Sequence, residues 1–355
     1  MTIHVHGYAT KSPTDTLKPV NFERRDPKPD DVVIKILHCG VCHSDIHTAR
    51  NEWGATHYPC VPGHEIIGLV EALGSKVEKF KVGDLVGVGC LVDSCHRCNS
   101  CEGGLEQYCE NGFTGTYNSR DKIGGTTLPV TFGGYSSKIT VNEKFVLRIP
   151  DNLDPAGAAP LLCAGITTWS PLKHWKVGLG QKVGIIGLGG LGHMGVKFAH
   201  AMGAKVVMIT TSPDKGADAK KLGADEVLLS TDTPAMKAAQ GSFDFLLNTI
   251  PVGHNTDPYM TLLKRDATMV IVGAVEPLKQ LNGAILIFSR RHLAGSLIGG
   301  IAETQEMLDF CGKHNIVCDI EKVSIQDVNT AYDRTVKGDV KYRFVIDMTT
   351  LKGAS

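Results

Sequence analysis

The sequence has no excess of charge of either sign. Its 355 residues include 37 basic and 37 acidic side chains, which gives a formal net charge of zero at pH 7. Nucleic acids and anionic membranes bind strongly basic surfaces, so we expect neither as a partner. Hydrophobic residues make up 42% and charged residues 21% of the chain, a balance typical of a soluble globular protein.

Long hydrophobic runs are also missing. No stretch approaches the roughly 18 uninterrupted apolar residues of a membrane helix. The segment from Met1 to Gly7 has neither a basic start nor an apolar run, so it does not resemble a secretion signal. The sequence shows no internal repeats, low-complexity tracts or coiled-coil heptads. We therefore expect a cytoplasmic protein.

The chain is long enough for two domains, because one ordinary hydrophobic core holds fewer residues than this. Residues 1 to about 150 contain short apolar runs, such as 32–37 and 66–70, between turns rich in Gly, Pro and Asp. This pattern predicts short strands. The many glycines suit tight turns and bulges in a curled sheet.

The pattern changes after about residue 154. Asp154 and Pro155 are typical of the N-cap and the first residue of a helix. Strands and helices are then expected to alternate, with strands at 182–186, 205–209, 243–247 and 268–272 and helices at 191–202 and 217–222. Such alternation predicts a parallel sheet.

A glycine-rich turn lies between the first of these strands and its helix. Its sequence, Gly187-Leu188-Gly189-Gly190-Leu191-Gly192, matches the pattern G-x-G-x-x-G. In this context Gly187 permits a tight turn, Gly189 lets the backbone approach a pyrophosphate, and Gly192 lets the helix pack close to the strand. The free N–H groups at the helix start favour phosphate. A turn without a ligand is the alternative, and the second strand at the right distance argues against it.

Eleven cysteines are many for such a chain, and their number is odd. Metal ligation explains them better than disulfides do. Four fall in one stretch with the spacing Cys95-x2-Cys98-x2-Cys101-x7-Cys109. Four thiolates can enclose one zinc ion and leave no position for water, which predicts a structural site. An iron–sulfur cluster and free cysteines remain as alternatives.

A second set of candidate ligands is dispersed along the chain. Cys42, His64 and Cys163 would give zinc three protein ligands and one open position, the arrangement of a catalytic site. Spacing alone does not bring these three together. Each one taken singly is better interpreted as a packing cysteine or a hydrogen-bonded histidine.

The residues around His64 carry a resemblance to a known family. Gly63-His64-Glu65-x2-Gly68-x5-Gly74-x2-Val77 matches the zinc-type alcohol dehydrogenase signature at every fixed position. Over almost its full length the chain resembles the medium-chain zinc dehydrogenases, within them the cinnamyl-alcohol-dehydrogenase group, and particularly its bacterial NADP-dependent aldehyde reductases. The resemblance implies an α/β protein. Its GroES-like, β-rich catalytic domain would span 1–153 and 297–355, and its Rossmann domain, with a doubly wound parallel sheet, would span 154–296.

The resemblance also implies roles for single residues. Cys42, His64 and Cys163 match catalytic zinc ligands, and Glu65 matches a carboxylate that can bind the metal when substrate is absent. Asp45 matches the acid that orients the ligand histidine, while Ser44 and His47 match a proton relay. The remaining cysteines match no ligand position and are interpreted as packing residues: Cys39, Cys60, Cys90, Cys311 and Cys318. Trp53 either lines the substrate pocket or packs.

The expected cofactor is NADP(H). NAD enzymes place an acid at the end of the second strand, and by resemblance Thr211 stands there, with Lys215 close enough to supply positive charge. Two departures count against this. Asp214 could serve NAD, and Gly216 replaces a residue that is often basic in relatives. The cofactor-binding residues implied are Gly187, Leu188, Gly189, Gly190, Leu191, Gly192, Thr210, Thr211, Ser212, Lys215, Thr249, Gly273, Ser296, Leu297 and Ile298.

These expectations combine into one function. The resemblance implies a zinc-dependent oxidoreductase that reversibly reduces aldehydes to primary alcohols with NADPH, holds one catalytic and one structural zinc, and forms a homodimer. A nucleic-acid module that uses the cysteine cluster as a finger is the first alternative, which the zero net charge and the glycine turn disfavour. A dehydrogenase fold without activity is the second, which the retained catalytic ligands disfavour.

Overall fold

The computed structural model describes residues 2–120, 130–273 and 276–352. The chain divides into two compact units, one of residues 1–163 and 299–355 and one of residues 164–298. Asp154 caps helix α3 (Pro155–Ala158) by accepting a hydrogen bond from Gly157 N at 2.9 Å, and Pro155 is the first helical residue. Helix α3 packs against strands of the first unit. The first unit therefore extends to residue 163, beyond the expected boundary at residue 153.

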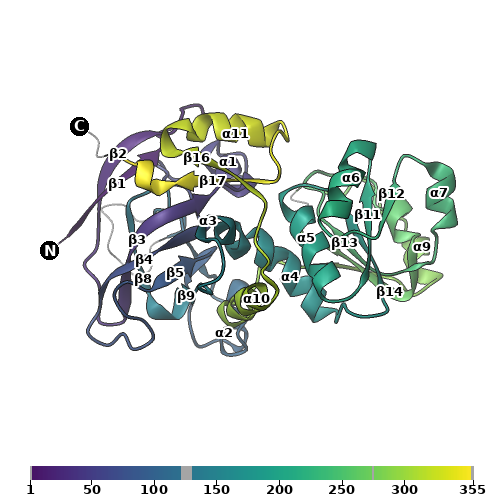
Figure 1. Cartoon of the computed structure of the whole chain (residues 1–355), viewed down its shortest axis with the longest axis horizontal. Helices are drawn as coiled ribbons and strands as arrows, with labels where there is room; N and C mark the ends of the chain where they lie inside the picture. The colour runs from purple at the N-terminus through teal and green to yellow at the C-terminus, as the bar shows by residue number, and fades with distance from the viewer. Residues whose placement is uncertain (1, 121–129, 274–275, 353–355) are drawn as a thin grey trace. The chain divides into compact units, whose positions relative to one another are not determined.

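The first unit is built on a seven-stranded sheet (Figure 1). Six strands follow the order β16-β17-β3-β4-β5-β9, and β8 also pairs with β3; all neighbours are antiparallel except β16 and β17. The strands are β3 (Asp31–Gly40), β4 (Ile66–Leu73), β5 (Leu85–Val88), β8 (Lys138–Asn142), β9 (Leu147–Arg148), β16 (Ile320–Ser324) and β17 (Arg343–Asp347). Two register shifts interrupt the β3–β4 pairing. A Cβ at Gly68 would lie 2.3 Å from Lys35 O, so only glycine permits this approach.

Smaller elements complete this unit. The pairs β1 (Ile3–Ala9) with β2 (Lys18–Arg24), and β6 (Leu91–Asp93) with β7 (Thr114–Gly115), form two-stranded sheets. The helices are α1 (His43–Ala49), α2 (Asn99–Glu102), α3, α10 (Ile301–His314) and α11 (Val328–Val336). Short 3-10 turns are η1 (Glu106–Tyr108), η2 (Glu143–Phe145), η3 (Ala159–Leu162), η4 (Ile325–Asp327) and η5 (Met348–Thr350).

The second unit is a six-stranded, wholly parallel sheet in the order β12-β11-β10-β13-β14-β15. Its strands are β10 (Lys182–Ile186), β11 (Lys205–Thr210), β12 (Glu226–Leu229), β13 (Phe243–Asn248), β14 (Leu263–Ile271) and β15 (His292–Gly295). Its helices are α4 (Ala164–His174), α5 (Gly190–Ala201), α6 (Pro213–Lys221), α7 (Thr233–Ala238), α8 (Asp257–Met260) and α9 (Gly283–Ile287). The parallel sheet confirms the expected α/β class. Helix α6 starts four positions before the predicted 217, since Pro213 takes its first position.

Both faces of the parallel sheet are buried, as βαβ crossovers require. Ile186 and Leu246 belong to an apolar cluster that also receives Met236 from α7. The neighbouring Ile185 and Leu247 point to the opposite face, where both lie beside Gly195 of α5. Successive residues of these strands therefore serve different helix layers, which explains their unbroken apolar runs. Within the described residues, no helix is long and apolar enough to cross a bilayer.

Candidate functional site

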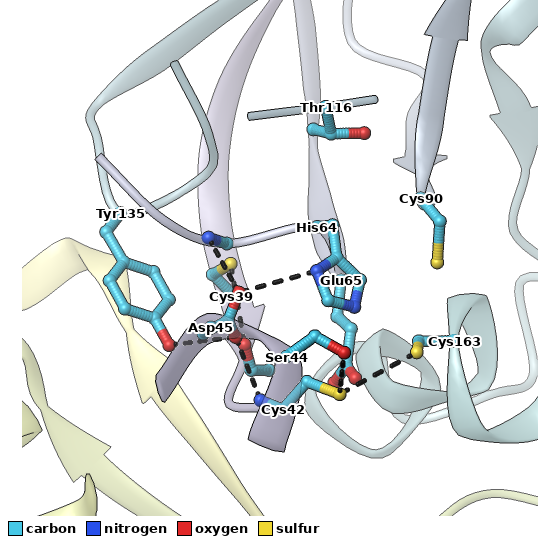
Figure 2. Close-up of polar contacts among 12 residues, drawn as sticks. Cys39, Cys42, Ser44, Asp45, His64, Glu65, Cys90, Thr116, Tyr135 and Cys163 are labelled. Atoms are coloured by element: carbon cyan, nitrogen blue, oxygen red, sulfur yellow. Dashed lines mark hydrogen bonds and ion pairs between the residues drawn. The ribbon is translucent and has the colours of Figure 1, made fainter. Parts of the chain in front are cut away.

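Four potential metal ligands from distant parts of the chain converge in the first unit (Figure 2). Cys42 is the N-cap of α1, His64 and Glu65 immediately precede β4, and Cys163 follows η3. One donor atom from each lies within 4.8 Å of the others, and all four residues are buried. The structure therefore brings together the set that spacing alone does not assemble.

The donor atoms of this cluster suit a metal ion. The Sγ atoms of Cys42 and Cys163 are 3.9 Å apart. His64 Nε2 and Glu65 Oε2 are buried and have no hydrogen-bond partner. Leaving buried polar atoms unpaired is costly, and a coordinated cation would satisfy both of them. Two sulfurs and an imidazole nitrogen are ligands that zinc prefers.

Asp45 fixes the ring of His64. Its Oδ1 lies 3.4 Å from His64 Nδ1 and accepts a hydrogen bond from Gly63 N at 3.1 Å. Its Oδ2 accepts from Cys42 N at 2.9 Å and from the hydroxyl of Tyr135 at 3.2 Å. With Nδ1–H directed at Asp45, Nε2 is the nitrogen left to bind a metal. The completely buried carboxylate thus holds two candidate ligands at once.

Glu65 has a partner that the sequence did not reveal. Arg343 Nη2 forms an ion pair with Glu65 Oε1, and both side chains are buried. Burial raises the pKa of Glu65 to about 8, while the Arg343 guanidinium acts in the opposite direction. Arg343 opens β17, 278 positions along the chain from Glu65, so no local pattern could link them.

Ser44 and His47 both lie on α1, beside the ligand cluster. The Ser44 hydroxyl accepts a hydrogen bond from Cys42 Sγ at 3.6 Å. His47 Nδ1 lies 2.5 Å from Glu52 Oε2, and its ring stacks on Trp53 with 5.0 Å between centroids. Sequence reasoning missed Glu52 and left Trp53 open; Trp53 is half exposed and stacks on His47.

The loop after α1 places Glu52 and Trp53 against His47. Asn51, Gly54 and Ala55 all have positive φ, at 54°, 77° and 59°. Thr56 closes the loop, since its N–H donates to Asn51 Oδ1 and its hydroxyl to Thr48 O. A left-handed turn of this kind returns the chain toward the helix it has just left.

Cys90, interpreted from the sequence as a packing cysteine, follows β5 and lies beside the cluster (Figure 2). It is not one of the four residues whose donor atoms lie within 4.8 Å of one another. The contact with Cys163 lowers the pKa of Cys90 to about 6, against the effect of burial. Its Sγ also lies 3.7 Å from Leu162 O.

The four clustered cysteines form a second candidate metal site. One Sγ from each of Cys95, Cys98, Cys101 and Cys109 lies within 4.8 Å of the others. The backbone N–H of Cys95 donates to Cys109 Sγ, and that of Glu110 donates to Cys98 Sγ. Such N–H donors stabilise thiolates. His96 Nε2 is 2.8 Å from Asp93 Oδ1, so this histidine has another partner.

The glycine turn of the second unit has three different steric demands. Gly187 has φ of 91°. A Cβ at Gly192 would lie 1.9 Å from Gly187 O, whereas a Cβ at Gly189 would meet nothing within 4 Å. Gly192 is therefore needed for packing and Gly189 for open space above the backbone. Thr249 braces the turn, its hydroxyl donating to Ile186 O at 2.8 Å and Gly187 O at 3.0 Å.

The other expected cofactor residues lie at strand ends of the same sheet. Gly273 follows β14 closely, and its Cβ would lie 2.5 Å from Thr249 O. Ser296, Leu297 and Ile298 follow β15. These residues share the carboxyl edge of a parallel sheet with the glycine turn, which is where α/β proteins bind ligands.

The segment after β11 presents hydroxyls and one cation. Thr210 ends the strand, Thr211 is exposed, and Ser212 is the N-cap of α6. Lys215 and Asp214 are both exposed in the first turn of α6. Gly216, in contrast, is buried, and a Cβ there would lie 3.0 Å from Val227.

Comparisons with known proteins agree with this geometry. Residues 28–151 match the alcohol dehydrogenase GroES-like domain, and residues 190–313 match the zinc-binding dehydrogenase family. The chain is 57% identical over 351 residues to aldehyde reductase YahK of Escherichia coli (strain K12), covering 98% of both chains. It is 50% identical over 349 residues to NADP-dependent alcohol dehydrogenase C 1 of Mycolicibacterium smegmatis, covering 98% of this chain and 99% of that one.

The chain also has a fold similar to that of a solved structure. The cinnamyl alcohol dehydrogenase of Helicobacter pylori, complexed with NADP(H), superposes with a TM-score of 0.92 at 42% identity. The match covers 99% of this chain and 100% of that chain.

Proposed function

The chain belongs to the zinc-binding alcohol dehydrogenase family, and on that premise we propose that it reduces aldehydes reversibly to primary alcohols with NADPH. The observation that carries the proposal is the buried cluster of Cys42, His64, Glu65 and Cys163 with its unpaired nitrogen and oxygen. The glycine cradle on the same chain supplies the place for a dinucleotide.

Cys42, His64 and Cys163 would hold the catalytic zinc, with Glu65 as a further ligand. When bound there, the ion acts as a Lewis acid toward the aldehyde oxygen. Asp45 keeps His64 Nε2 pointed into the cluster. Arg343 balances the charge of Glu65, so the carboxylate can be either held aside or shared with the metal.

Cys95, Cys98, Cys101 and Cys109 would hold the structural zinc. Four sulfurs fill a tetrahedral shell, so this ion has no position for substrate. Its contribution is to the folding of the segment that carries it.

Ser44 and His47, both on α1, would transfer protons during the reaction. The Ser44 hydroxyl contacts Cys42 Sγ at 3.6 Å and would supply the proton that the reduced substrate oxygen takes up. His47 exchanges protons with the surroundings, because Glu52 accepts its Nδ1–H and leaves Nε2 free.

The glycine turn would receive the pyrophosphate of NADP(H), which carries the hydride. The hydroxyls of Thr210, Thr211 and Ser212 and the ammonium of Lys215 would hold the 2′-phosphate. The exposed Thr211 and Lys215 support this assignment. Gly216 is buried against Val227, so Lys215 would be the cation that this segment offers to the phosphate.

Two measurements test the function. Metal analysis should find two zinc ions per chain, whereas a finger-type protein would hold one. An aldehyde panel assayed with both cofactors should show higher kcat/KM with NADPH. Thr211→Asp and Lys215→Ala should each weaken NADPH use by roughly tenfold or more, since one charge-assisted phosphate contact is worth about 1.5–3 kcal/mol. Equal efficiency with NADH and NADPH in the parent enzyme would contradict the cofactor assignment.

A homodimer is part of the proposal. Strand β15 is at the edge of the parallel sheet. The side chains of Ile287, the last residue of α9, and of Phe288 are 79% and 86% exposed. An exposed strand edge flanked by apolar side chains favours pairing with a second copy. Sedimentation at micromolar concentration should show a dimer, and a monomer would refute this.

We also propose a cytoplasmic location. None of the eleven cysteines, all of which lie in the described residues, forms a disulfide, which suits a reducing compartment in which thiolates remain available for metal. Cell fractionation tests it, and recovery outside the cytoplasm would contradict it.

A further inference from the structure

His254 lies in the loop that follows β13, at the carboxyl edge of the parallel sheet. Its Nδ1 lies 2.8 Å from Val252 O, and its Nε2 lies 2.9 Å from Asn248 Nδ2. Asn248 is the last residue of β13 and is completely buried. Both ring nitrogens of this half-buried histidine are therefore engaged by the loop and the strand before it. The sequence pattern did not single out this residue.

The partners of His254 fix which ring nitrogen carries the proton. A carbonyl oxygen only accepts, so Nδ1 must be protonated to donate to Val252 O. Asn248 Oδ1 accepts from the backbone N–H of Ile250 at 3.1 Å, so the amide nitrogen is the end that faces His254. An amide nitrogen only donates, and Nε2 must accept with a free lone pair. The two contacts thus require the same neutral form, with the proton on Nδ1.

Three contacts hold this loop against the sheet. The hydrogen bond between His254 and the end of β13 is the first. Gly253 N donates to Glu276 Oε2 at 2.8 Å, which ties the loop to the segment that follows β14. The hydroxyl of Thr249 donates to Gly187 O at 3.0 Å, which ties the start of the loop to the glycine turn. The loop therefore joins two segments to which cofactor binding is assigned.

The strand order places this loop on the path of the cofactor. On the proposed function, the 2′-phosphate lies after β11 and the pyrophosphate at the glycine turn after β10. The neighbour of β10 on its other side is β13, so the nicotinamide half continues over the end of β13. Ile250 comes close to the turn, since a Cβ at Gly187 would lie 3.4 Å from its Cγ1.

We propose that His254, as the neutral Nδ1–H tautomer, is a positioning residue that holds the loop 249–254 in the shape that receives the nicotinamide half of NADP(H). This inference rests on the proposed function. His254 acts through Asn248, because loss of its Nε2 acceptor would leave a buried amide N–H without a partner. An imidazolium ring cannot do the same, since a protonated Nε2 has no lone pair for that amide.

Fluorescence titration of the full chain with NADPH, without substrate, tests the role. His254→Ala should raise the Kd by roughly tenfold, the effect of leaving one buried hydrogen-bonding group unsatisfied. His254→Gln should recover most of the affinity, because its Oε1 can accept from the Asn248 amide. His200→Ala is the matched control, since this exposed histidine lies at the end of α5 away from the glycine turn, and it should bind NADPH as the parent does. Calorimetry checks that each variant is folded.

Nuclear magnetic resonance reads the tautomer in the parent chain. With nitrogen-15 in the histidine rings, the signals that disappear in His254→Gln belong to His254. One protonated ring nitrogen, Nδ1, and one unprotonated ring nitrogen are expected at neutral pH. A doubly protonated ring or an Nε2–H tautomer would overturn the proposal.

The binding data can refute the proposal independently. Parent-like NADPH affinity in His254→Ala would show that the loop does not need the histidine. Equal losses in His254→Ala and His254→Gln would show that the acceptor at Nε2 is not what matters. Failure of the parent chain to bind NADPH would instead contradict the proposed function itself.

Discussion

Two alanine substitutions in the glycine turn should separate folding from cofactor binding. In Gly192→Ala the new Cβ would lie 1.9 Å from Gly187 O. Gly187 O is a backbone atom and a Cβ at residue 192 would be fixed in place by the backbone, so the turn itself must open. Overpacking of this kind costs about 1–3 kcal/mol, which should lower the melting temperature by several degrees.

Gly189→Ala is the matched control for folding. Its Cβ meets nothing within 4 Å, and its φ of −147° is open to any residue. Stability should therefore hold, or rise by about 0.4–1 kcal/mol through the reduced freedom of the unfolded chain. The methyl group would, however, occupy the space that the pyrophosphate needs. Losing even one charge-assisted contact there weakens NADPH binding by roughly tenfold or more.

Calorimetry and fluorescence titration with NADPH measure the two effects independently. The expected pattern is a folded Gly189→Ala protein with weak NADPH binding and a less stable Gly192→Ala protein. Parent-like NADPH affinity in Gly189→Ala would show that the pyrophosphate does not lie over this residue. Equal losses of stability in both variants would refute the steric argument.

Two further pairs of variants probe the metal sites and the relay. Cys163→Ser should abolish turnover with little change in melting temperature, whereas Cys98→Ser should lower the melting temperature because metal binding at a closed site is folding energy; unfolding of Cys163→Ser, or parent-like melting of Cys98→Ser, would reverse the two roles. His47→Gln should slow turnover at neutral pH without changing NADPH affinity, and Glu52→Gln should do so to a smaller degree because it loses the charged acceptor at Nδ1. Parent-like pH–rate profiles in both variants would remove the pair from proton transfer.

Some features of this protein could be predicted because their determinants are local. The apolar runs of β10, β11 and β13 reflect burial on both sheet faces, and the glycine turn lies within six consecutive residues. The four-cysteine cluster likewise occupies one short stretch. For these features, neighbouring residues in the sequence remain neighbours in the fold. The helix cap at Asp154 could also be predicted from the sequence. The sequence did not, however, indicate on which of the two units α3 packs.

Only the tertiary structure decided which side chains surround the dispersed site. Arg343 reaches Glu65 because β17 pairs with β3, whose end leads to Cys42. Cys90 lies beside the cluster because the end of β5 packs on η3. Such proximity comes from strand pairing and packing between distant segments, and it leaves no periodicity or spacing in the sequence. The sequence alone therefore determined the local scaffolds and the metal-binding residue types, while the fold determined which charges and thiols act on them.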